Sequence, residues 1–133
     1  MPGETDLATL LASLDPVLDA REYGFAVLPL GQDLPVGFSL LASFREDEGL
    51  TLIAPADDLA AAGIAGANGW ARITMMVQSS LEAVGMTAAM ATALTKSGIS
   101  ANVVAAYHHD HLFVPWTRRD EAVAVLRALA AAS

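Results

Sequence analysis

The chain has 133 residues, of which 54% are hydrophobic and 17% are charged, so we expect one globular unit or two small subdomains that share a core. Its formal net charge of −8 argues against nucleic acid and anionic membrane surfaces as partners. The absence of cysteine excludes disulfides, thiolate catalysis and thiolate zinc sites. The N-terminus lacks the basic region and the length of a signal or membrane-spanning segment, so a cytoplasmic location is expected.

The first predicted element is an amphipathic helix that begins near Thr5 and ends before Pro16. Its apolar stripe follows the i, i+3, i+4, i+7 spacing and consists of Leu7, Leu10, Leu11 and Leu14. Residues 23–30 (YGFAVLPL) predict a strand, and residues 31–37 (GQDLPVG) contain the glycines and proline of a loop.

A hairpin and a short helix are predicted next. Residues 40–44 and 50–54 are two predicted strands, and the short polar segment between them favours a hairpin. Pro55 suits the first turn of a helix that ends at Gly63.

Residues 65–69 (AGANG) are small and flexible, which is typical of a linker. We therefore predict a boundary there, between an N-terminal subdomain of residues 1–64 and a second subdomain of residues 70–133. A weak internal similarity favours duplication, because the strands LTLIAP and HLFVP each precede a predicted helix with early carboxylates.

The second subdomain is predicted to start with a strand, residues 70–77 (WARITMMV), and a long helix. A capping box predicts the helix start, with Ser79 bonding forward and Glu82 reaching back. Lys96 and Gly98 are typical of its last turn and C-terminal glycine. The predicted buried stripe consists of Leu81, Val84, Ala88, Ala91 and Leu94.

Two more strands and a helix follow. Residues 99–107 and 111–114 predict strands on either side of a polar turn, and Thr117 is predicted to cap the last helix. The buried face of that helix is predicted to consist of Ala122, Val125, Leu126 and Leu129.

The element order of the second half is strand, helix, strand, strand, helix, which is the ferredoxin-like arrangement without its last strand. The fold class is therefore α+β. The closing strand is expected to come from the first subdomain or from another chain; otherwise the sheet has an open edge, which favours pairing.

Two stretches of the second half closely resemble a bacterial group of small ACT-domain proteins. Residues 78–88 (QSSLEAVGMTA) and 98–115 (GISANVVAAYHHDHLFVP) are similar to its recurrent signatures SSLEAVGxTA and GISxNVxAxYxHDHLFVP. Residues 2–59 look like the N-terminal subdomain that accompanies the ACT domain in that group. The resemblance implies a ferredoxin-like fold of two tandem ACT-like subdomains, with antiparallel sheets and helices packed on one face. It also implies a dimer related to modules that sense amino acids.

The resemblance further implies a binding site. In such modules the ligand lies near the loop after the first ACT strand and near the facing second strand, often at an interface between ACT units. The implied ligand-binding residues are Gln78, Ser79, Ser80, Leu81, Ser100, Ala101, Asn102 and Val103.

The residue types at these positions suit an amino acid. Backbone N–H groups at a helix start near Ser79 favour a carboxylate. Asn102 offers both a donor and an acceptor, and Ser100 is expected on the same face. The alternatives are a helix that is merely capped by its own serine, and an asparagine that bonds to its own turn or strand edge.

The cluster His108-His109-Asp110-His111 contains residue types that bind metals. In an extended strand His109 and His111 lie on one face and the other two side chains lie on the opposite face, so one strand does not offer three ligands to one ion. We predict a structural turn, with a metal-binding or pH-sensing role as the alternative.

No catalytic residue, metal site or cofactor is predicted. No serine lies in an elbow motif, no threonine or lysine is recognisably paired with a histidine, and no phosphate-loop or dinucleotide-binding glycine pattern occurs. The prediction is a non-catalytic regulatory module that binds a small molecule, an amino acid, and forms a homodimer. The alternative is a structural or oligomerisation module that assembles with a partner protein without a ligand, and an enzyme or metal-dependent protein ranks last.

Overall fold

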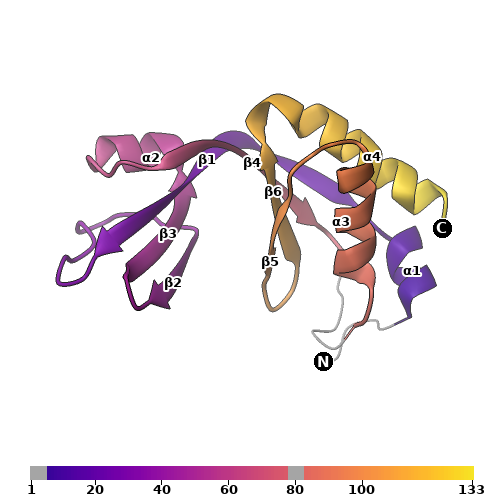
Figure 1. The fold of residues 1–133 in the computed structure, drawn as a ribbon, viewed down its shortest axis with the longest axis horizontal. Helices are drawn as coiled ribbons and strands as arrows, with labels where there is room; N and C mark the ends of the chain where they lie inside the picture. Colours follow the sequence, from indigo (N-terminus) through magenta and orange to yellow (C-terminus); the bar gives the residue numbers. More distant parts are fainter. Residues whose placement is uncertain (1–5, 78–82) are drawn as a thin grey trace. The chain divides into compact units, whose positions relative to one another are not determined.

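The computed structural model describes residues 6–77 and 83–133 of the chain (Figure 1). The elements in chain order are α1 (Leu7–Ala12), β1 (Pro16–Pro29), β2 (Ala42–Glu46), β3 (Gly49–Pro55), α2 (Ala56–Ala61), β4 (Ala67–Met75), α3 (Met86–Lys96), β5 (Asn102–Ala105), β6 (Asp110–Pro115), the 3-10 turn η1 (Trp116–Arg118) and α4 (Arg119–Ala131). No helix in these described residues is long and apolar enough to cross a membrane.

The six strands form an antiparallel sheet in the order β2-β3-β1-β4-β6-β5. This confirms the predicted α+β, ferredoxin-like class. β4 has β1 as its second neighbour, and the Met76 backbone N–H donates to the Asp15 carbonyl at 2.9 Å just beyond the two strands. The closing strand that the second half lacks is therefore supplied by the first half, which was the first of the three predicted alternatives.

Contacts divide the chain into two compact units. The helical unit contains the described residues up to Asp19 together with those of Ala71–Ser133, and the hairpin unit contains Ala20–Trp70. The beginning of β1 and most of β4 thus belong to the helical unit. The division into subdomains of residues 1–64 and 70–133 stays a prediction.

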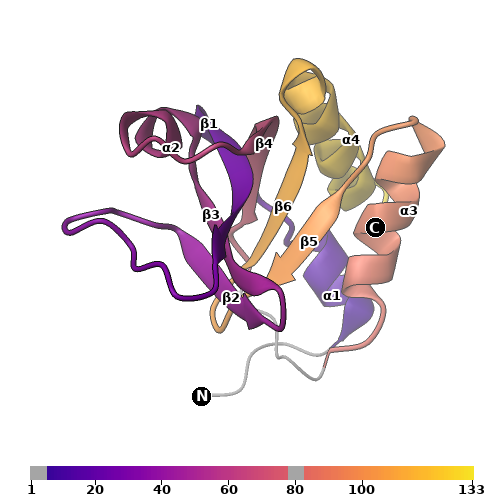
Figure 2. The ribbon, with the colours of Figure 1, turned by 60° about the vertical axis from the view of Figure 1, so that its left-hand side comes forward.

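In the helical unit, α1, α3 and α4 lie on one side of β4 and β6 (Figure 2). Alternate residues of β4, namely Ala71, Ile73 and Met75, are buried in the core because successive side chains of a strand point to opposite faces. The other buried members of this core are Leu10, Leu14, Val77, Met86, Met90, Leu94, Ile99, Leu112, Val114, Ala122, Val123 and Leu126. The described residues of the predicted ligand site, residues 100–103, belong to this unit.

In the hairpin unit, β2 and β3 form the predicted hairpin, with Phe44 opposite Thr51. β1 pairs with the other edge of β3. α2 begins directly after Pro55, as predicted, and its Leu59 is 1% exposed. Leu52 of β3 is also fully buried, so both α2 and β3 contribute to the small core of this unit.

The start of α3 was predicted wrongly. The helix begins at Met86, and Gly85, with φ 96°, is its N-cap. Ala83 and Val84, which the capping box would place inside the helix, are not helical. A glycine in the left-handed region interrupts a helix at no steric cost, whereas the serine and glutamate pattern is only a local preference. The predicted end at Lys96 and Gly98 is confirmed.

The buried stripe of α3 also differs from the prediction. It consists of Met86, Met90 and Leu94, of which only Leu94 was predicted. Val84 is 81% exposed and Ala88 is exposed, while Leu81 lies outside the described residues. Because the helix starts later, its apolar face is set by the larger methionines, whose burial removes more apolar area from water than that of alanine.

Three strand boundaries were also wrong. β1 begins at Pro16 and not at residue 23, and β4 begins at Ala67, inside the stretch predicted as a linker. β5 covers only Asn102–Ala105 of the predicted 99–107. Pairing between β1 and β4 extends both strands into polar or glycine-rich sequence that has little intrinsic strand preference.

The last helix was placed correctly but its cap was not. Thr117 lies inside η1, and α4 follows Arg118 without a side-chain cap bond. The buried residues of α4 are Ala122, Val123 and Leu126, so Val123 replaces the predicted Val125 and Leu129, which are only half-buried.

Candidate functional site

The first half of the predicted ligand site, Gln78, Ser79, Ser80 and Leu81, lies outside the described residues. The residues on both sides belong to the helical unit. Val77 is buried in its core, and Ala83 is half-buried against the same core.

The second half of the predicted site lies between α3 and β5. Ala101 and Val103 pack against the core of the helical unit, whereas Ser100 and Asn102 are exposed. Ser100 and Asn102 alternate with Ala101 and Val103, which face the core, so both polar side chains point away from it. Within the described part of the chain, neither of these two polar side chains has a hydrogen-bond partner. Their hydroxyl and amide groups are therefore available to a ligand.

The corner that precedes Ser100 is held by backbone hydrogen bonds. The Ile99 N–H donates to the Leu94 carbonyl at 3.0 Å, and the Gly98 N–H donates to the Thr95 carbonyl at 2.9 Å. This pair of bonds is the Schellman motif, and it requires the left-handed conformation of Gly98, whose φ is 70°. The chain thus leaves α3 in one defined direction.

Arg118 of η1 fixes the same corner from outside. Its guanidinium donates to the Ser97 carbonyl at 2.9 Å and to the Gly98 carbonyl at 3.4 Å. Its Nε also donates to Glu121 Oε1 at 2.7 Å, a bond that raises the pKa of Arg118 and lowers the pKa of Glu121. Sequence analysis predicted no role for Arg118, because the carbonyls that it binds are 20 and 21 residues away.

A polar cluster lies on the face of β4 and β6 that points away from the helices. It consists of Asp19, Arg72, Thr74 and His111. Arg72 Nη1 lies 3.5 Å from Asp19 Oδ2, and Arg72 Nε lies 3.4 Å from His111 Nδ1. Thr74 Oγ1 lies 3.0 Å from the same histidine nitrogen. Sequence analysis found no threonine paired with a histidine, and the structure corrects this.

The contact with Arg72 indicates the tautomer of the neutral His111 ring. Arg72 Nε can only donate, so His111 Nδ1 accepts and the ring proton lies on Nε2. Burial, followed by the charges of Arg72 and His109, lowers the pKa of His111. Because His111 Nδ1 already accepts from Arg72, it is a poor base toward the Thr74 hydroxyl. The contact between Thr74 and His111 therefore links β4 to β6 and does not activate a nucleophile.

The histidine-rich segment forms a turn between β5 and β6. The Ala106 N–H donates to the His109 carbonyl at 3.1 Å, and the buried His109 Nδ1 has no hydrogen-bond partner in the described part of the chain. Asp110 is 7% exposed, and its burial raises its pKa. No three His, Asp or Glu side chains among the described residues are placed to hold a metal ion.

Replacing His111 with glutamine is expected to reduce the dependence of the free energy of unfolding on pH below neutrality. The pKa of His111 is lower in the folded chain than its ordinary 6.5, so the unfolded chain takes up the proton first as pH falls. The wild-type chain therefore loses stability as pH drops below about 6.5 and until it reaches the folded pKa, and H111Q lacks this loss. Urea unfolding between about pH 8 and about pH 5 measures both slopes. The matched control is His108→Gln at an exposed position of the same turn, and equal slopes in the two variants would contradict the assignment.

Two family models match the chain, and both describe an ACT domain. One matches residues 2–70 and the other matches residues 67–128. Among curated proteins, none matches the chain.

Several solved structures are similar to this chain. A Vibrio cholerae protein of unknown function is 41% identical, over 93% of this chain and 95% of that one, with a TM-score of 0.82. An Agrobacterium tumefaciens protein is 19% identical over 88% of this chain and 89% of that one, with a TM-score of 0.74. The regulatory subunit of aspartate kinase from Thermus thermophilus is 10% identical over 86% of this chain and 97% of its own, with a TM-score of 0.62. At these identities the last two similarities concern the fold alone.

Proposed function

This chain belongs to the ACT domain family, and on that premise we propose that it is a non-catalytic regulatory module that binds an amino acid or a similar small carboxylate. The resemblance drawn from its two sequence motifs is confirmed, and ACT matches cover the first half of the chain as well as the second.

The observation that carries the proposal is the tandem arrangement of two ACT matches in one antiparallel sheet. The fold is similar to that of an aspartate kinase regulatory subunit and to that of Escherichia coli aspartokinase III, which has been solved with aspartate and ADP. Residues that would hold an amino acid are also present, since Ser100 and Asn102 are exposed beside a hydrogen-bonded corner and have no partner among the described residues.

The proposed ligand site combines the loop residues Gln78, Ser79, Ser80 and Leu81 with Ser100, Ala101, Asn102 and Val103. In it, Asn102 presents its amide to the α-amino or carboxylate group, and backbone N–H groups of the loop bind the carboxylate. β5 is the last strand in the sheet order, so a second copy of the chain can cover this edge and complete the site as a homodimer.

A thermal-shift screen against the twenty amino acids tests the proposal. A ligand present at about one hundred times its Kd stabilises the native state by about 2.7 kcal/mol, which raises the Tm of a chain of this size by roughly 5–10 °C. Asn102→Ala is expected to remove most of the shift. Ser43→Ala, an exposed polar position on the opposite edge strand β2, is expected to keep it.

The outcomes separate the two function classes. A selective shift that Asn102→Ala abolishes and Ser43→Ala preserves supports amino acid sensing at this site. If no amino acid shifts the Tm and the chain is still dimeric by light scattering, the structural or oligomerisation module becomes the better description.

A further inference from the structure

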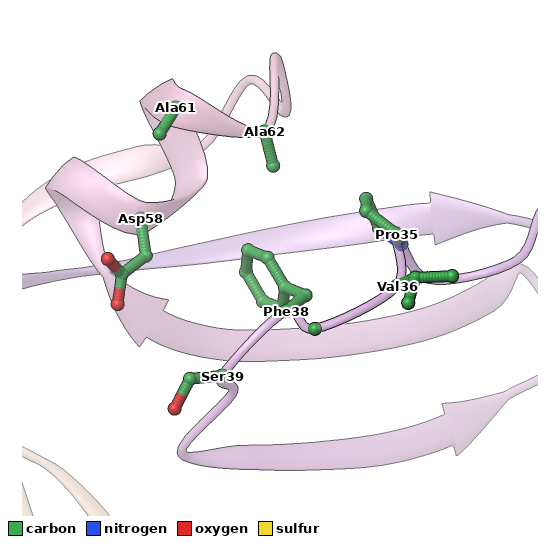
Figure 3. A pocket seen from close by; sticks show the side chains of 8 residues that line it. Pro35, Val36, Phe38, Ser39, Asp58, Ala61 and Ala62 are labelled. Carbon is green, nitrogen blue, oxygen red and sulfur yellow. The ribbon is translucent and has the colours of Figure 1, made fainter.

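A pocket of about 330 Å³ lies in the hairpin unit, between α2 and the loop that joins β1 to β2 (Figure 3). Figure 3 shows the Asp58 carboxylate on α2 and the Phe38 ring and Ser39 hydroxyl on the loop. Ala61 and Ala62 form the wall on the helix side, and Pro35 forms part of the wall on the loop side. All of these residues belong to one compact unit.

The loop side of the pocket is shaped by a turn. The Phe38 N–H donates to the Pro35 carbonyl at 3.1 Å, and Gly37 at the third position has φ 78°. A positive φ at the third residue is characteristic of a type II turn, which glycine adopts without strain. On the other side, α2 is anchored by the buried Leu59, and its two alanines are too small to fill the space. The pocket is therefore built from a defined turn and an anchored helix.

The pocket lining favours a cation. Asp58 is the only charged residue that lines it, and this half-buried carboxylate has no hydrogen bond or ion pair within residues 6–77 and 83–133. Phe38 also lines the pocket, and the π face of an aromatic ring attracts ammonium groups. Among the described residues no basic side chain lines the pocket, so the Asp58 carboxylate would repel a carboxylate or phosphate ligand with no cation to offset it. The net charge of −8 adds a general attraction for cations.

We propose that this pocket binds a small organic monocation with an apolar body, of the primary alkylamine class. The ammonium group donates to the Asp58 carboxylate and to the Ser39 hydroxyl, and the apolar body lies against Phe38 and the alanine wall. Such a ligand lacks the carboxylate of an amino acid. The site therefore goes beyond the amino acid site proposed in the helical unit and does not depend on it.

NMR titration of the full chain with n-butylammonium tests the site, with 1-butanol as the neutral counterpart of similar size. Saturable amide shifts are expected at Phe38, Ala61 and Ala62. Asp58→Asn is expected to weaken binding by at least about tenfold, because it removes a charge-assisted hydrogen bond. The matched control is Asp57→Asn, which makes the same charge change one residue away on α2 but is exposed and outside the pocket. It is expected to change binding by less than about twofold.

Phe38→Leu is a second test of the site, and this substitution does not alter α2. It keeps an apolar loop anchor and removes the ring face, so it is expected to weaken n-butylammonium binding by about threefold or more. Equal weakening by Asp57→Asn and Asp58→Asn would show that net charge alone attracts the cation, and this would overturn the proposal. Equal binding of 1-butanol, or the absence of saturable shifts, would overturn it as well. None of these outcomes bears on the amino acid screen, which concerns the other unit.

Discussion

Replacement of Leu94 with alanine is expected to lower the free energy of unfolding by about 3 kcal/mol. Leu94 is 0% exposed in the core of the helical unit, where α3 packs against α4 and the sheet. Truncation loses the transfer free energy of the removed methyl groups and leaves a cavity that the surrounding side chains fill only in part. Urea or guanidinium unfolding, with an unchanged m-value, measures the loss.

The matched control is Leu30→Ala, the same truncation at a side chain that is 73% exposed. It is expected to change stability by less than about 0.5 kcal/mol. A loss below about 1 kcal/mol for Leu94→Ala would contradict the packing of α3 described above. Because Ala101 and Val103 of the proposed site pack against the same core, the same variant is expected to weaken the amino acid response.

Local pattern and turn chemistry were sufficient to predict most of the elements. The hairpin of β2 and β3, the helix that follows Pro55 and the glycine end of α3 at Gly98 each rest on residues within a few positions of one another. The element order of the second half indicated the ferredoxin-like class, and its motifs then indicated the family. What failed locally was the start of α3, where Gly85 outweighed a capping box.

The polar cluster could not be predicted, because it depends on strand register. The alternation of Arg72 and Thr74 with buried apolar residues in β4 does indicate that two polar side chains share a face. Which residues they meet is decided by the neighbours β1 and β6, which bring Asp19 and His111 from 53 and 39 residues away from Arg72 (72 − 19 and 111 − 72). No local pattern contains that information.

The pocket of the hairpin unit was missed for a similar reason. Residues 31–37 were predicted to form a loop. Asp58 was predicted only to lie in the first turn of a helix, where a negative charge interacts favourably with the helix dipole. The pocket arises where the side chains of that loop and of α2 meet, since Phe38 and Asp58 are 20 residues apart (58 − 38). The preference of the pocket for a cation follows from the presence of Asp58 and from the lack of a basic side chain among the described lining residues.

Substitution of Gly49 with alanine is expected to destabilise the chain by about 3 kcal/mol. Gly49 is paired with Glu46 in the hairpin and has φ 150°, a conformation that L side chains rarely adopt. An added Cβ would lie 2.6 Å from the Leu28 carbonyl oxygen and 3.0 Å from Val27 Cγ2. The oxygen belongs to the backbone of β1, so it can move only if the pairing of β1 with β3 is distorted.

Gly63→Ala separates backbone strain from this close contact. Gly63 also has a positive φ, 71°, but an added Cβ would meet no atom within 4 Å. Its replacement is therefore expected to cost about 1 kcal/mol, the strain of a left-handed residue alone. The difference between the two variants, measured by denaturant unfolding, contains the backbone contact between β1 and β3 and the difference in strain between φ 150° and φ 71°. Equal losses in the free energy of unfolding would mean that β1 and β3 move apart at this position at little cost. The pairing of these strands would then contribute little to the stability of the hairpin unit.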